Sequence, residues 1–325
     1  MTNLNSEQEN ARSSKARYTL VLAGPGTGKT STLVGRYRFL LENKINSSEI
    51  LCCSFTTKST NELKNRMAFE TSSNIKDLKI QTFDALALKI LKKIGSEIGI
   101  PKDFETWTNN FEKMQVIEKL QSEVIEAGSY TDIDTDEIST LKVLEFIDAA
   151  RRKGLDPEDA SIQAVEENDK IAAAHCEVYY AYDRYQMETG KFDFAMIAHL
   201  ACKALAKNNS SNKKFASQFK HLLVDEFQDI NLCQKILIDL FCESGCTFWA
   251  VGDDYQAIYG FRGSDVAYIL DFQKNFPSAE IFQLRKNYRS GKKILRLAEN
   301  LSKHFLKSHQ KELHATSENE GNVYH

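Results

Sequence analysis

The sequence predicts an α/β fold in which a parallel sheet carries the functional residues and an all-helical segment interrupts the sheet domain. Short runs of Val, Ile, Leu and Phe alternate with longer helical stretches, as in β-α units. Several of these runs end in glycine-rich or acidic turns, and open parallel sheets bind their ligands at the carboxyl ends of the strands. The middle of the chain, residues 96–190, has few strand-like runs and carries apolar residues at helical spacing. These residues are Phe111, Met114, Ile117 and Val124, then Leu141, Leu144 and Ile147.

The five predicted strands follow one another along the chain. Each is a short apolar run with a chemically distinctive turn directly after it. The strands are Tyr18–Leu22 before AGPGTGKT, Ile50–Phe55 before TTKS, Leu222–Val224 before DEFQD, Phe248–Val251 before GDDYQ and Ile281–Leu284 before RKNYRS.

Charge divides the chain in the same way. The formal net charge is only −3, but residues 96–190 hold 22 Asp and Glu against 9 Lys and Arg, a balance of −13. The remainder of the 325 residues holds 33 basic against 23 acidic side chains, a balance of +10. A basic frame of this kind suits a polyanion, and a solvated charged surface is the alternative.

Composition excludes several classes of protein. Hydrophobic residues make up 42% and charged residues 27% of the chain, as in ordinary globular proteins. There is no run of about 18 apolar residues and no apolar leader, so the sequence predicts a cytoplasmic protein with no membrane partner. The seven cysteines form no C-x-x-C pair and the seven histidines show no zinc-binding spacing, which favours reduced, buried thiols.

The strongest chemical signal is AGPGTGKT at residues 23–30, between the first strand and a predicted helix over residues 31–42. Its glycines let backbone N–H groups surround a phosphate at a helix N-terminus. Lys29 would bring a mobile charge to the β- and γ-phosphates, and the Thr30 hydroxyl would be a ligand of Mg²⁺. The strict P-loop pattern has glycine at position 23, and a turn that only caps a helix is the alternative. The predicted nucleotide-binding residues are Ala23, Gly24, Pro25, Gly26, Thr27, Gly28, Lys29, Thr30 and Ser31.

A carboxylate pair follows the third predicted strand. A P-loop requires a carboxylate on a neighbouring strand to hold Mg²⁺, and Asp225 stands at that strand end. Glu226 beside it could polarise an attacking water. Many strands end in acidic turns, so the carboxylate pair alone is weak evidence for a metal site. Together with the P-loop it becomes strong evidence. Because 196 residues separate Lys29 from Asp225, the helical segment is expected to be inserted between the phosphate and metal sites.

The ordered motifs resemble those of the UvrD/Rep/PcrA-like superfamily 1 DNA helicases, and the resemblance covers most of the chain. Position 84 departs from the family pattern, which more often has His there. The matching segments are LNSEQ (4–8) for the adenine-reading Q motif, AGPGTGKT (23–30) for motif I, SFTTK (54–58) for motif Ia, QTFD (81–84) for motif Ib, FDF (192–194) for the return from the insertion, VDEFQD (224–229) for motif II, GDDYQAIYGFRG (252–263) for motif III and NYRS (287–290) for motif IV.

The resemblance implies ATP and Mg²⁺, and it assigns further residues to the nucleotide. Gln8 would read the adenine edge with an amide that both donates and accepts, and Tyr288 would stack on the base. Arg36 would line the pocket, Gln256 would sense the γ-phosphate, and Arg289 would stabilise charge on the transferring phosphoryl group. Without the family, the polar segment around Gln8 would be interpreted as a disordered tail.

The resemblance also implies single-stranded DNA as a partner. Phe55, Tyr259 and Phe261 lie just past strand ends, where the family stacks bases on aromatic rings. Packing in the core is the alternative for each ring. Lys58 and Arg262 would hold phosphates, with solvated cations as the alternative.

The implied architecture is a discontinuous RecA-like ATP-binding domain (1A) over residues 1–95 and 191–280, with an all-helical insertion (1B) over residues 96–190. Residues 281–325 would begin a truncated second motor domain, because nothing after Ser290 resembles motifs V and VI. The prediction is therefore the ATP-binding half of an ATP-dependent 3′→5′ DNA helicase or translocase, weakly active alone. The alternative is a nucleotide- and DNA-binding fragment or subunit whose partner supplies the second motor. Repair, replication restart, plasmid and defence roles all stay open.

Overall fold

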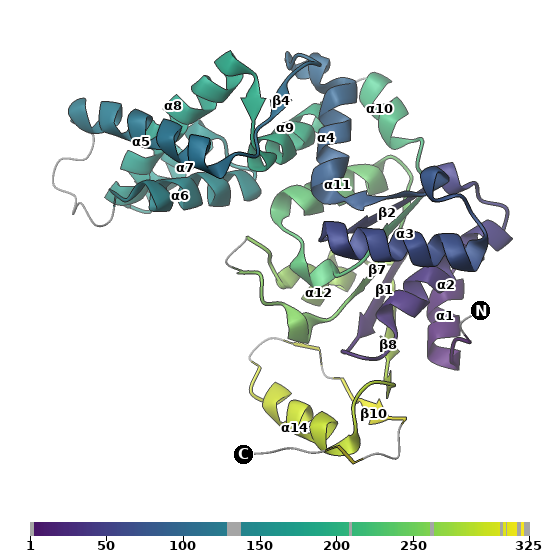
Figure 1. Ribbon diagram of the computed structural model, residues 1–325. Helices are drawn as coiled ribbons and strands as arrows, with labels where there is room; N and C mark the ends of the chain where they lie inside the picture. Colours follow the sequence, from purple (N-terminus) through teal and green to yellow (C-terminus); the bar gives the residue numbers. More distant parts are fainter. Residues whose placement is uncertain are drawn as a thin grey trace. The chain divides into compact units, whose positions relative to one another are not determined.

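A six-stranded sheet forms the centre of the computed structural model, which describes residues 3–128, 138–207, 210–260, 263–305, 308–309, 311–316 and 320–321. The strand order is β3-β2-β6-β7-β1-β8, and every pairing is parallel (Figure 1). The α/β class with a parallel sheet is therefore confirmed. The strands are β1 (Tyr18–Ala23), β2 (Ile50–Ser54), β3 (Lys79–Thr82), β6 (His221–Val224), β7 (Thr247–Gly252) and β8 (Glu280–Leu284).

All five predicted strands are present, each within one residue of its predicted bounds. Their Val, Ile, Leu and Phe residues are buried because helices cover both faces of the sheet, as expected for parallel strands. Strand β3 was not predicted. It lies at one edge of the sheet, where Lys79 and Gln81 need no buried environment, so its sequence lacks a continuous apolar run.

One face of the sheet packs against α1 (Ser6–Ser13), α2 (Lys29–Glu42) and α3 (Thr57–Thr71). The buried residues of this face include Ala11, Val21, Leu33, Val34, Tyr37, Cys52, Leu63, Met67, Leu223, Trp249 and Val251.

The other face carries a cluster of aromatic rings. Phe248 of β7 lies with its ring centroid 5.5 Å from Phe227, 5.7 Å from Phe272 and 5.6 Å from Phe276. These partners belong to the short helices η5 (Phe227–Asp229) and α13 (Phe272–Asn275) and to the residue after α13. The two packed faces fix the sheet, so the turns at its carboxyl edge are held in place.

The chain divides into two compact units. Unit 1 comprises Met1–Phe83, Lys213–Ile230 and Leu237–His325, and unit 2 comprises Asp84–Asn212 and Asn231–Ile236. These limits differ from the boundaries expected after residues 95, 190 and 280. In particular, β8 was expected at the start of a second motor domain, but it pairs with β1 within the central sheet.

Beyond the sheet, unit 1 contains a short parallel pair of strands and α14 (Lys292–Ser302). Strand β9 (Lys286–Asn287) pairs with β10 (His314–Ala315), so the segment after α14 returns to lie beside the segment before it. The remaining elements of this unit are η1 (Ser47–Glu49), η2 (Ile75–Asp77), η6 (Asp254–Gln256) and α12 (Ala267–Leu270).

Unit 2 is built mainly from helices that share one core. The core includes Trp107, Ile117, Val143, Ile147 and Tyr182. A two-residue parallel pair, β4 (Glu105–Thr106) with β5 (Lys191–Phe192), accompanies them, so β4 interrupts the segment that was expected to be all helical. The helices within this unit or at its borders are α4 (Phe83–Ile94), η3 (Gly95–Ile98), α5 (Asn110–Glu126), α6 (Thr140–Arg152), α7 (Pro157–Glu166), α8 (Lys170–Thr189), α9 (Phe194–Ala206), α10 (Ser210–Ala216) and α11 (Leu232–Glu243).

Both apolar stripes expected in the middle segment lie on helices, α5 and α6, but the stripes are only partly buried. Ile117 and Ile147 lie in the core, whereas Phe111 and Leu141 are 71% and 55% exposed. The exposed pair lies in the first turn of each helix, and the first buried residues are Ile117 in α5 and Val143 in α6. Within the described part of the chain, none of the helices combines the length and the apolar character needed to cross a membrane.

Candidate nucleotide and DNA sites

The glycine-rich loop at residues 23–30 joins β1 to α2 and shapes its backbone for an anion. Gly26 and Gly28 have φ angles of 74° and 90°, in the left-handed region that favours glycine. A Cβ on Gly26 would meet the Cβ of Arg289 at 2.6 Å, so glycine is required where these two segments meet. The loop leads into the first turn of α2, whose free N–H groups and dipole favour a phosphate.

A cavity of about 680 Å³ adjoins this loop, within the range of ~300–1,000 Å³ that is typical of small-molecule sites. Three lining residues were not predicted, namely Asn3, Glu62 and Arg66. The predicted residues that line it are Gln8, Pro25, Gly26, Gly28, Lys29, Thr30, Ser31, Glu226, Gln256, Tyr288 and Arg289.

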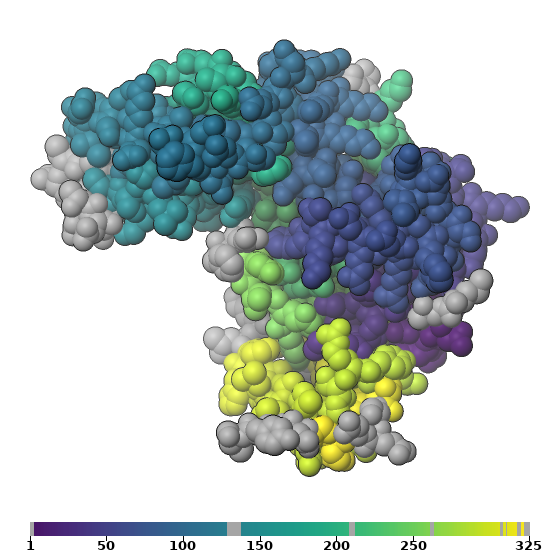
Figure 2. All heavy atoms as spheres, in the orientation of Figure 1, coloured from purple at the N-terminus to yellow at the C-terminus, as the bar shows by residue number. Residues whose placement is uncertain are grey.

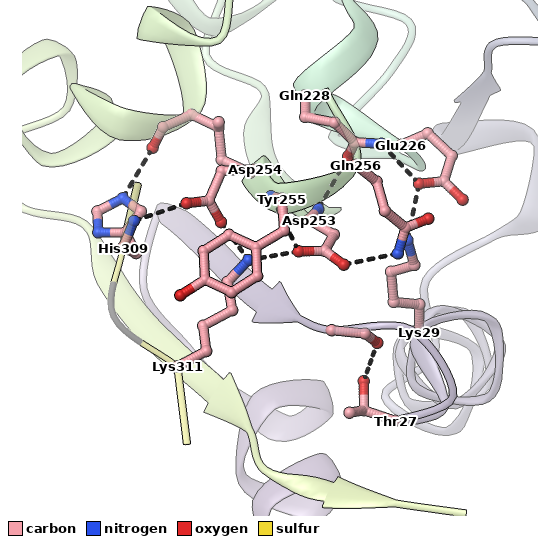
Figure 3. A network of polar contacts seen from close by, with 12 residues as sticks. Thr27, Lys29, Glu226, Gln228, Asp253, Asp254, Tyr255, Gln256, His309 and Lys311 are labelled. Atoms are coloured by element: carbon pink, nitrogen blue, oxygen red, sulfur yellow. Dashed lines mark hydrogen bonds and ion pairs between the residues drawn. The ribbon is translucent and has the colours of Figure 1, made fainter. Parts of the chain in front are cut away.

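Lys29 and Glu226 form an ion pair in this cavity (Figure 3). The Lys29 Nζ lies 2.9 Å from the Glu226 Oε2, and the Gln228 Nε2 donates to the same oxygen at 2.9 Å. Glu226 has a φ of 50°, a left-handed conformation that costs a non-glycine residue about 1–3 kcal/mol when the surroundings impose it. The turn after β6 therefore holds this carboxylate in one orientation, close to the cation of the loop.

Asp225 meets the main requirement for a metal ligand, which is an unsatisfied buried oxygen. The residue is 6% exposed, and its Oδ1 accepts no hydrogen bond among the described residues. Burial, assisted by the neighbouring Glu226 carboxylate, raises the pKa of Asp225 to about 7. A divalent cation would relieve both effects, so Asp225 and the Thr30 hydroxyl fit Mg²⁺. No cluster of three or more His, Cys, Asp and Glu suited to a metal occurs among the described residues, so phosphate oxygens would have to complete the coordination.

Gln8 lies in an ordered helix rather than in a disordered tail. It forms a capping box with Asn5: the Asn5 side chain accepts from the Gln8 N–H at 2.9 Å, and the Gln8 Oε1 accepts from the Asn5 N–H at 3.0 Å. The Gln8 Nε2 donates to the Thr27 carbonyl at 2.9 Å. Each amide atom keeps a second hydrogen-bonding position for an adenine edge.

Tyr288 stands beside Gln8, although 280 residues separate them in the sequence. The Asn5 Nδ2 donates to the Tyr288 hydroxyl at 2.7 Å, and the Tyr288 N–H donates to the Gly26 carbonyl at 2.9 Å. The side chain is 52% exposed, so a ring face is accessible to a base. The N-terminal and C-terminal parts of unit 1 lie against each other in the space-filling view (Figure 2).

Arg36 does not line the cavity. It is 4% exposed, and its Nη1 donates to the Arg12 and Ser14 carbonyls at 2.8 and 2.6 Å, while burial lowers its pKa to about 10. It lies two turns of α2 beyond Lys29, away from the phosphate end of the helix. The predicted residues that do not line the cavity are Ala23, Gly24, Thr27, Arg36 and Asp225.

Arg66 of α3 is a cavity residue that was not predicted from the sequence. It lines the cavity, and its Nη2 donates to the Ser31 Oγ at 2.7 Å. Arg66 belongs to none of the motifs described above. The one feature of the sequence that could have pointed to it is its position on the helix that follows motif Ia. Only the packing of α3 against α2 brings it to the loop.

The predicted DNA residues divide into three groups. Phe55 and Tyr259 form a ring pair with centroids 5.0 Å apart, and both line a second cavity of about 410 Å³. Lys58 is exposed in the first turn of α3. Phe261 and Arg262 lie outside the described residues. Glu226 and Gln256 line both cavities, so the ring pair lies next to the groups expected around the γ-phosphate.

A parallel sheet with a glycine-rich loop between β1 and α2 defines a P-loop protein. The chain belongs to the UvrD/REP helicase N-terminal domain family, which matches residues 4–277. It is 29% identical over 303 residues to the ATP-dependent DNA helicase PcrA of Staphylococcus epidermidis, 30% identical over 303 residues to that of Leuconostoc citreum and 28% identical over 304 residues to that of Staphylococcus aureus. Each match covers 93% of this chain but only 39% or 40% of the relative. The chain therefore spans about 40% of the length of the curated relatives it matches.

Proposed function

We propose that this chain is the ATP-binding motor half of a Mg²⁺- and ATP-dependent 3′→5′ DNA helicase or translocase that acts on single-stranded DNA. The single observation that carries the proposal is one cavity lined by Lys29, Glu226, Gln256 and Arg289 together. Family membership and relatives named ATP-dependent DNA helicases support it. In this proposal the sheet of unit 1 is the RecA-like motor domain, the helices of unit 2 are its insertion, and the protein is cytoplasmic.

The geometry suggests how these residues would act on bound nucleotide. ATP with Mg²⁺ supplies a phosphoryl group on which negative charge develops during transfer to water. Lys29 would leave Glu226 for the phosphate oxygens, which carry more charge than one carboxylate. Glu226, still oriented by Gln228, would then be free to accept a proton from the attacking water. Arg289 would place its guanidinium on the phosphoryl oxygens.

The ring pair offers a site for single-stranded DNA. Phe55 and Tyr259 are each partly exposed and line a cavity, so a base could stack on them without the chain reading its identity. Gln256 lines both cavities and thus lies where a change at the γ-phosphate would reach the DNA residues. The 3′→5′ polarity is carried over from the family resemblance alone.

The test of nucleotide binding is the thermal stabilisation by Mg·AMP-PNP, a non-hydrolysable ATP analogue. At a ligand concentration of 100 times Kd the parent chain should gain about 2.7 kcal/mol. Lys29→Ala should lose this gain, because the cation nearest the phosphates is removed. Lys274→Ala is the matched control, since Lys274 is exposed before β8, at the amino edge of the parallel sheet. Equal stabilisation of Lys29→Ala and the control would refute the P-loop assignment.

Hydrolysis separates the motor from a chain that only binds. Steady-state ATP turnover, measured with and without single-stranded DNA, should be slow but detectable and should disappear in Glu226→Gln, which retains nucleotide binding. Turnover in Glu226→Gln at the parent rate would exclude Glu226 as the base. The alternative function is nucleotide and DNA binding without turnover until a partner supplies a second motor domain. Binding of both ligands with no hydrolysis by the parent chain would favour that alternative.

A further inference from the structure

A buried lysine near the carboxyl end of the described chain lies between two aspartates of motif III (Figure 3). Lys311 is 8% exposed and forms ion pairs with Asp253 and Asp254, which are 0% and 6% exposed. Its Nζ also lies 4.2 Å from the centroid of the Tyr255 ring. Two adjacent buried carboxylates repel each other, and the cation between them pairs with both and offsets one of the two negative charges.

Asp253 links this lysine to the nucleotide cavity. One carboxylate oxygen, Oδ1, receives the Lys311 ammonium, and the other, Oδ2, accepts from the Gln256 Nε2 at 2.6 Å. The backbone N–H of Asp253 donates to the Gln228 Oε1 at 2.9 Å. Gln228 in turn holds Glu226. Lys311 is therefore one bond from the acceptor that fixes Gln256, and Gln256 lines the cavity beside Lys29.

The segment that carries Lys311 is itself anchored at several points. The His309 N–H donates to the Asp254 Oδ2 at 2.6 Å, and β10 pairs with β9 three residues beyond Lys311. A Cβ on Gly24 would meet the Leu313 Cδ1 at 2.9 Å, so Leu313 packs directly on the phosphate loop. These contacts fix the position of Lys311 relative to the phosphate loop and to motif III.

We propose that Lys311 is a positioning residue that orients Gln256 toward the γ-phosphate by holding the Asp253 carboxylate in place as its hydrogen-bond acceptor. This inference rests on the proposed nucleotide function. Without the lysine cation, nothing would hold the two carboxylates together, and they would move apart. This movement would weaken the hydrogen bond that fixes the Gln256 amide, while the loop and the adenine side of the cavity would stay intact. Lys311 would thus affect recognition of the third phosphate and not nucleotide binding in general.

The experiment compares the affinities for Mg·AMP-PNP and Mg·ADP, measured by calorimetry. We expect the parent chain to prefer Mg·AMP-PNP, and Lys311→Met to reduce that preference about tenfold, the value of one hydrogen bond to a charged group. The affinity for Mg·ADP should stay within about twofold, since Gln256 does not meet the first two phosphates. Gln256→Ala should cause the same loss, and the double variant no greater loss. Lys303→Met, an exposed lysine of the same region, is the matched control.

Rescue separates positioning from a general structural role. Lys311→Arg keeps the cation and should recover part of the preference. Lys311→Ala leaves room for propylammonium, because Lys311 lines a hollow of about 180 Å³ together with Asp253, Tyr255 and Gln256. Propylammonium should restore the preference in Lys311→Ala, whereas the neutral propanol should not. Because these readouts are ratios within one variant, a lower melting temperature does not mimic them.

Two failures are distinguishable. A parent chain that binds neither nucleotide overturns the proposed function itself. A parent that prefers Mg·AMP-PNP overturns only the Lys311 proposal if Lys311→Met keeps the full preference, or if propanol rescues Lys311→Ala as well as propylammonium does. A parent that binds both nucleotides equally also overturns the Lys311 proposal, since there is then no third-phosphate recognition to position.

Discussion

Lys311 in unit 1 and Arg151 in unit 2 are each buried between two carboxylates, and the two clusters have different surroundings. In unit 1, Lys311 pairs with two aspartates and faces a tyrosine ring. In unit 2, Arg151 is fully buried, and its Nη1 donates to both carboxylate oxygens of Asp193 at 3.2 Å. Its Nη2 donates to Asp183 at 3.1 Å. The two clusters therefore resemble each other in burial and in charge.

The clusters differ in where the remaining carboxylate bonds go. Asp193 accepts from the Met196 N–H at 2.8 Å, which caps α9, and from the Tyr182 hydroxyl at 3.0 Å, which lies in the core. Asp253 instead accepts from Gln256, at the wall of a cavity. A buried ion pair therefore does not by itself indicate function. The groups that donate the remaining hydrogen bonds to the carboxylate show whether the pair serves the core or the wall of a cavity.

The largest expected effect is the loss of stability in Arg151→Met. Removal of one partner leaves Asp193 buried beside a neutral side chain. Burial raises the pKa of Asp193, but the Arg151 charge and the hydrogen bonds from the Met196 N–H and the Tyr182 hydroxyl together outweigh it and hold the pKa below its ordinary value. Breaking a buried pair in this way typically costs about 3–5 kcal/mol. Denaturant unfolding of unit 2 should show this loss, and the affinity ratio of Mg·AMP-PNP to Mg·ADP should stay unchanged.

The two tryptophans make this measurement specific. Trp107 lies in the core of unit 2 and Trp249 in the core of unit 1, so a Trp249→Phe background leaves one reporter in unit 2. Arg184→Met is the control, since that arginine side chain is 76% exposed in its pair with Glu188 and should contribute less than about 1 kcal/mol. Equal losses for Arg151→Met and Arg184→Met, or a changed nucleotide ratio in Arg151→Met, would remove the distinction between the clusters.

The central sheet could be predicted from sequence because its signals are local. Runs such as residues 50–53 are apolar throughout since both faces of the strand are buried, and each run is followed by a turn with distinctive residues. Strand β3 could not be recognised in this way because alternate residues of this edge strand are polar. The loop of residues 23–30 and Glu226 were recognisable as site residues for the same reason as the strands, because each lies in a short contiguous sequence motif.

The Lys311 cluster had no such signal. Lys311 and Asp253 are 58 residues apart, and their contact depends on the pairing of β10 with β9, two strands of only two residues each. Arg36 shows the opposite case. It was expected in the cavity from resemblance alone, but the sequence offered no measure of how far along α2 the cavity reaches. Contacts between residues that are far apart in the sequence and share no motif could be identified only in the structure.

The comparison between core and site also applies to aromatic rings, and here a smaller effect is expected, on the affinity for single-stranded DNA. Tyr182 packs in the core of unit 2, whereas Phe55 and Tyr259 line a cavity. Tyr259→Ala should weaken binding of labelled oligo-dT by ~1–3 kcal/mol, the value of one base stack, with a similar loss for oligo-dA. Fluorescence anisotropy measures both.

Phe69→Ala is the control for aromatic removal, since Phe69 is 84% exposed toward the end of α3, remote from the helix start that follows Phe55. Its affinity for oligo-dT should equal that of the parent. If Tyr259→Ala binds both oligonucleotides like the parent and only loses stability, Tyr259 belongs with Tyr182 among the core rings.

The smallest expected effect concerns pH and tests a half-buried group that serves the fold within unit 1. His221 begins β6 at the amino edge of the sheet, and its Nδ1 lies 2.6 Å from the Thr247 Oγ1. Burial, and next the Arg36 charge, lower its pKa to about 4, below the ordinary value near 6.5. Between these two values the unfolded chain binds a proton that the folded chain does not. The contribution of His221 is therefore present above pH 6.5 and is lost as the pH falls toward 4, with a slope below about 1.4 kcal/mol per pH unit.

In a Trp107→Phe background, where Trp249 reports on unit 1, His221→Asn should lose less stability than the parent between pH 6.5 and pH 4.5. The exposed His304→Asn should follow the parent curve. The nucleotide ratio should not change in either variant, because His221 lies at the edge of the sheet opposite to the phosphate loop. A His221→Asn curve that coincides with that of the parent would mean that this histidine is protonated in the folded chain, and the half-buried environment assigned to it would be wrong.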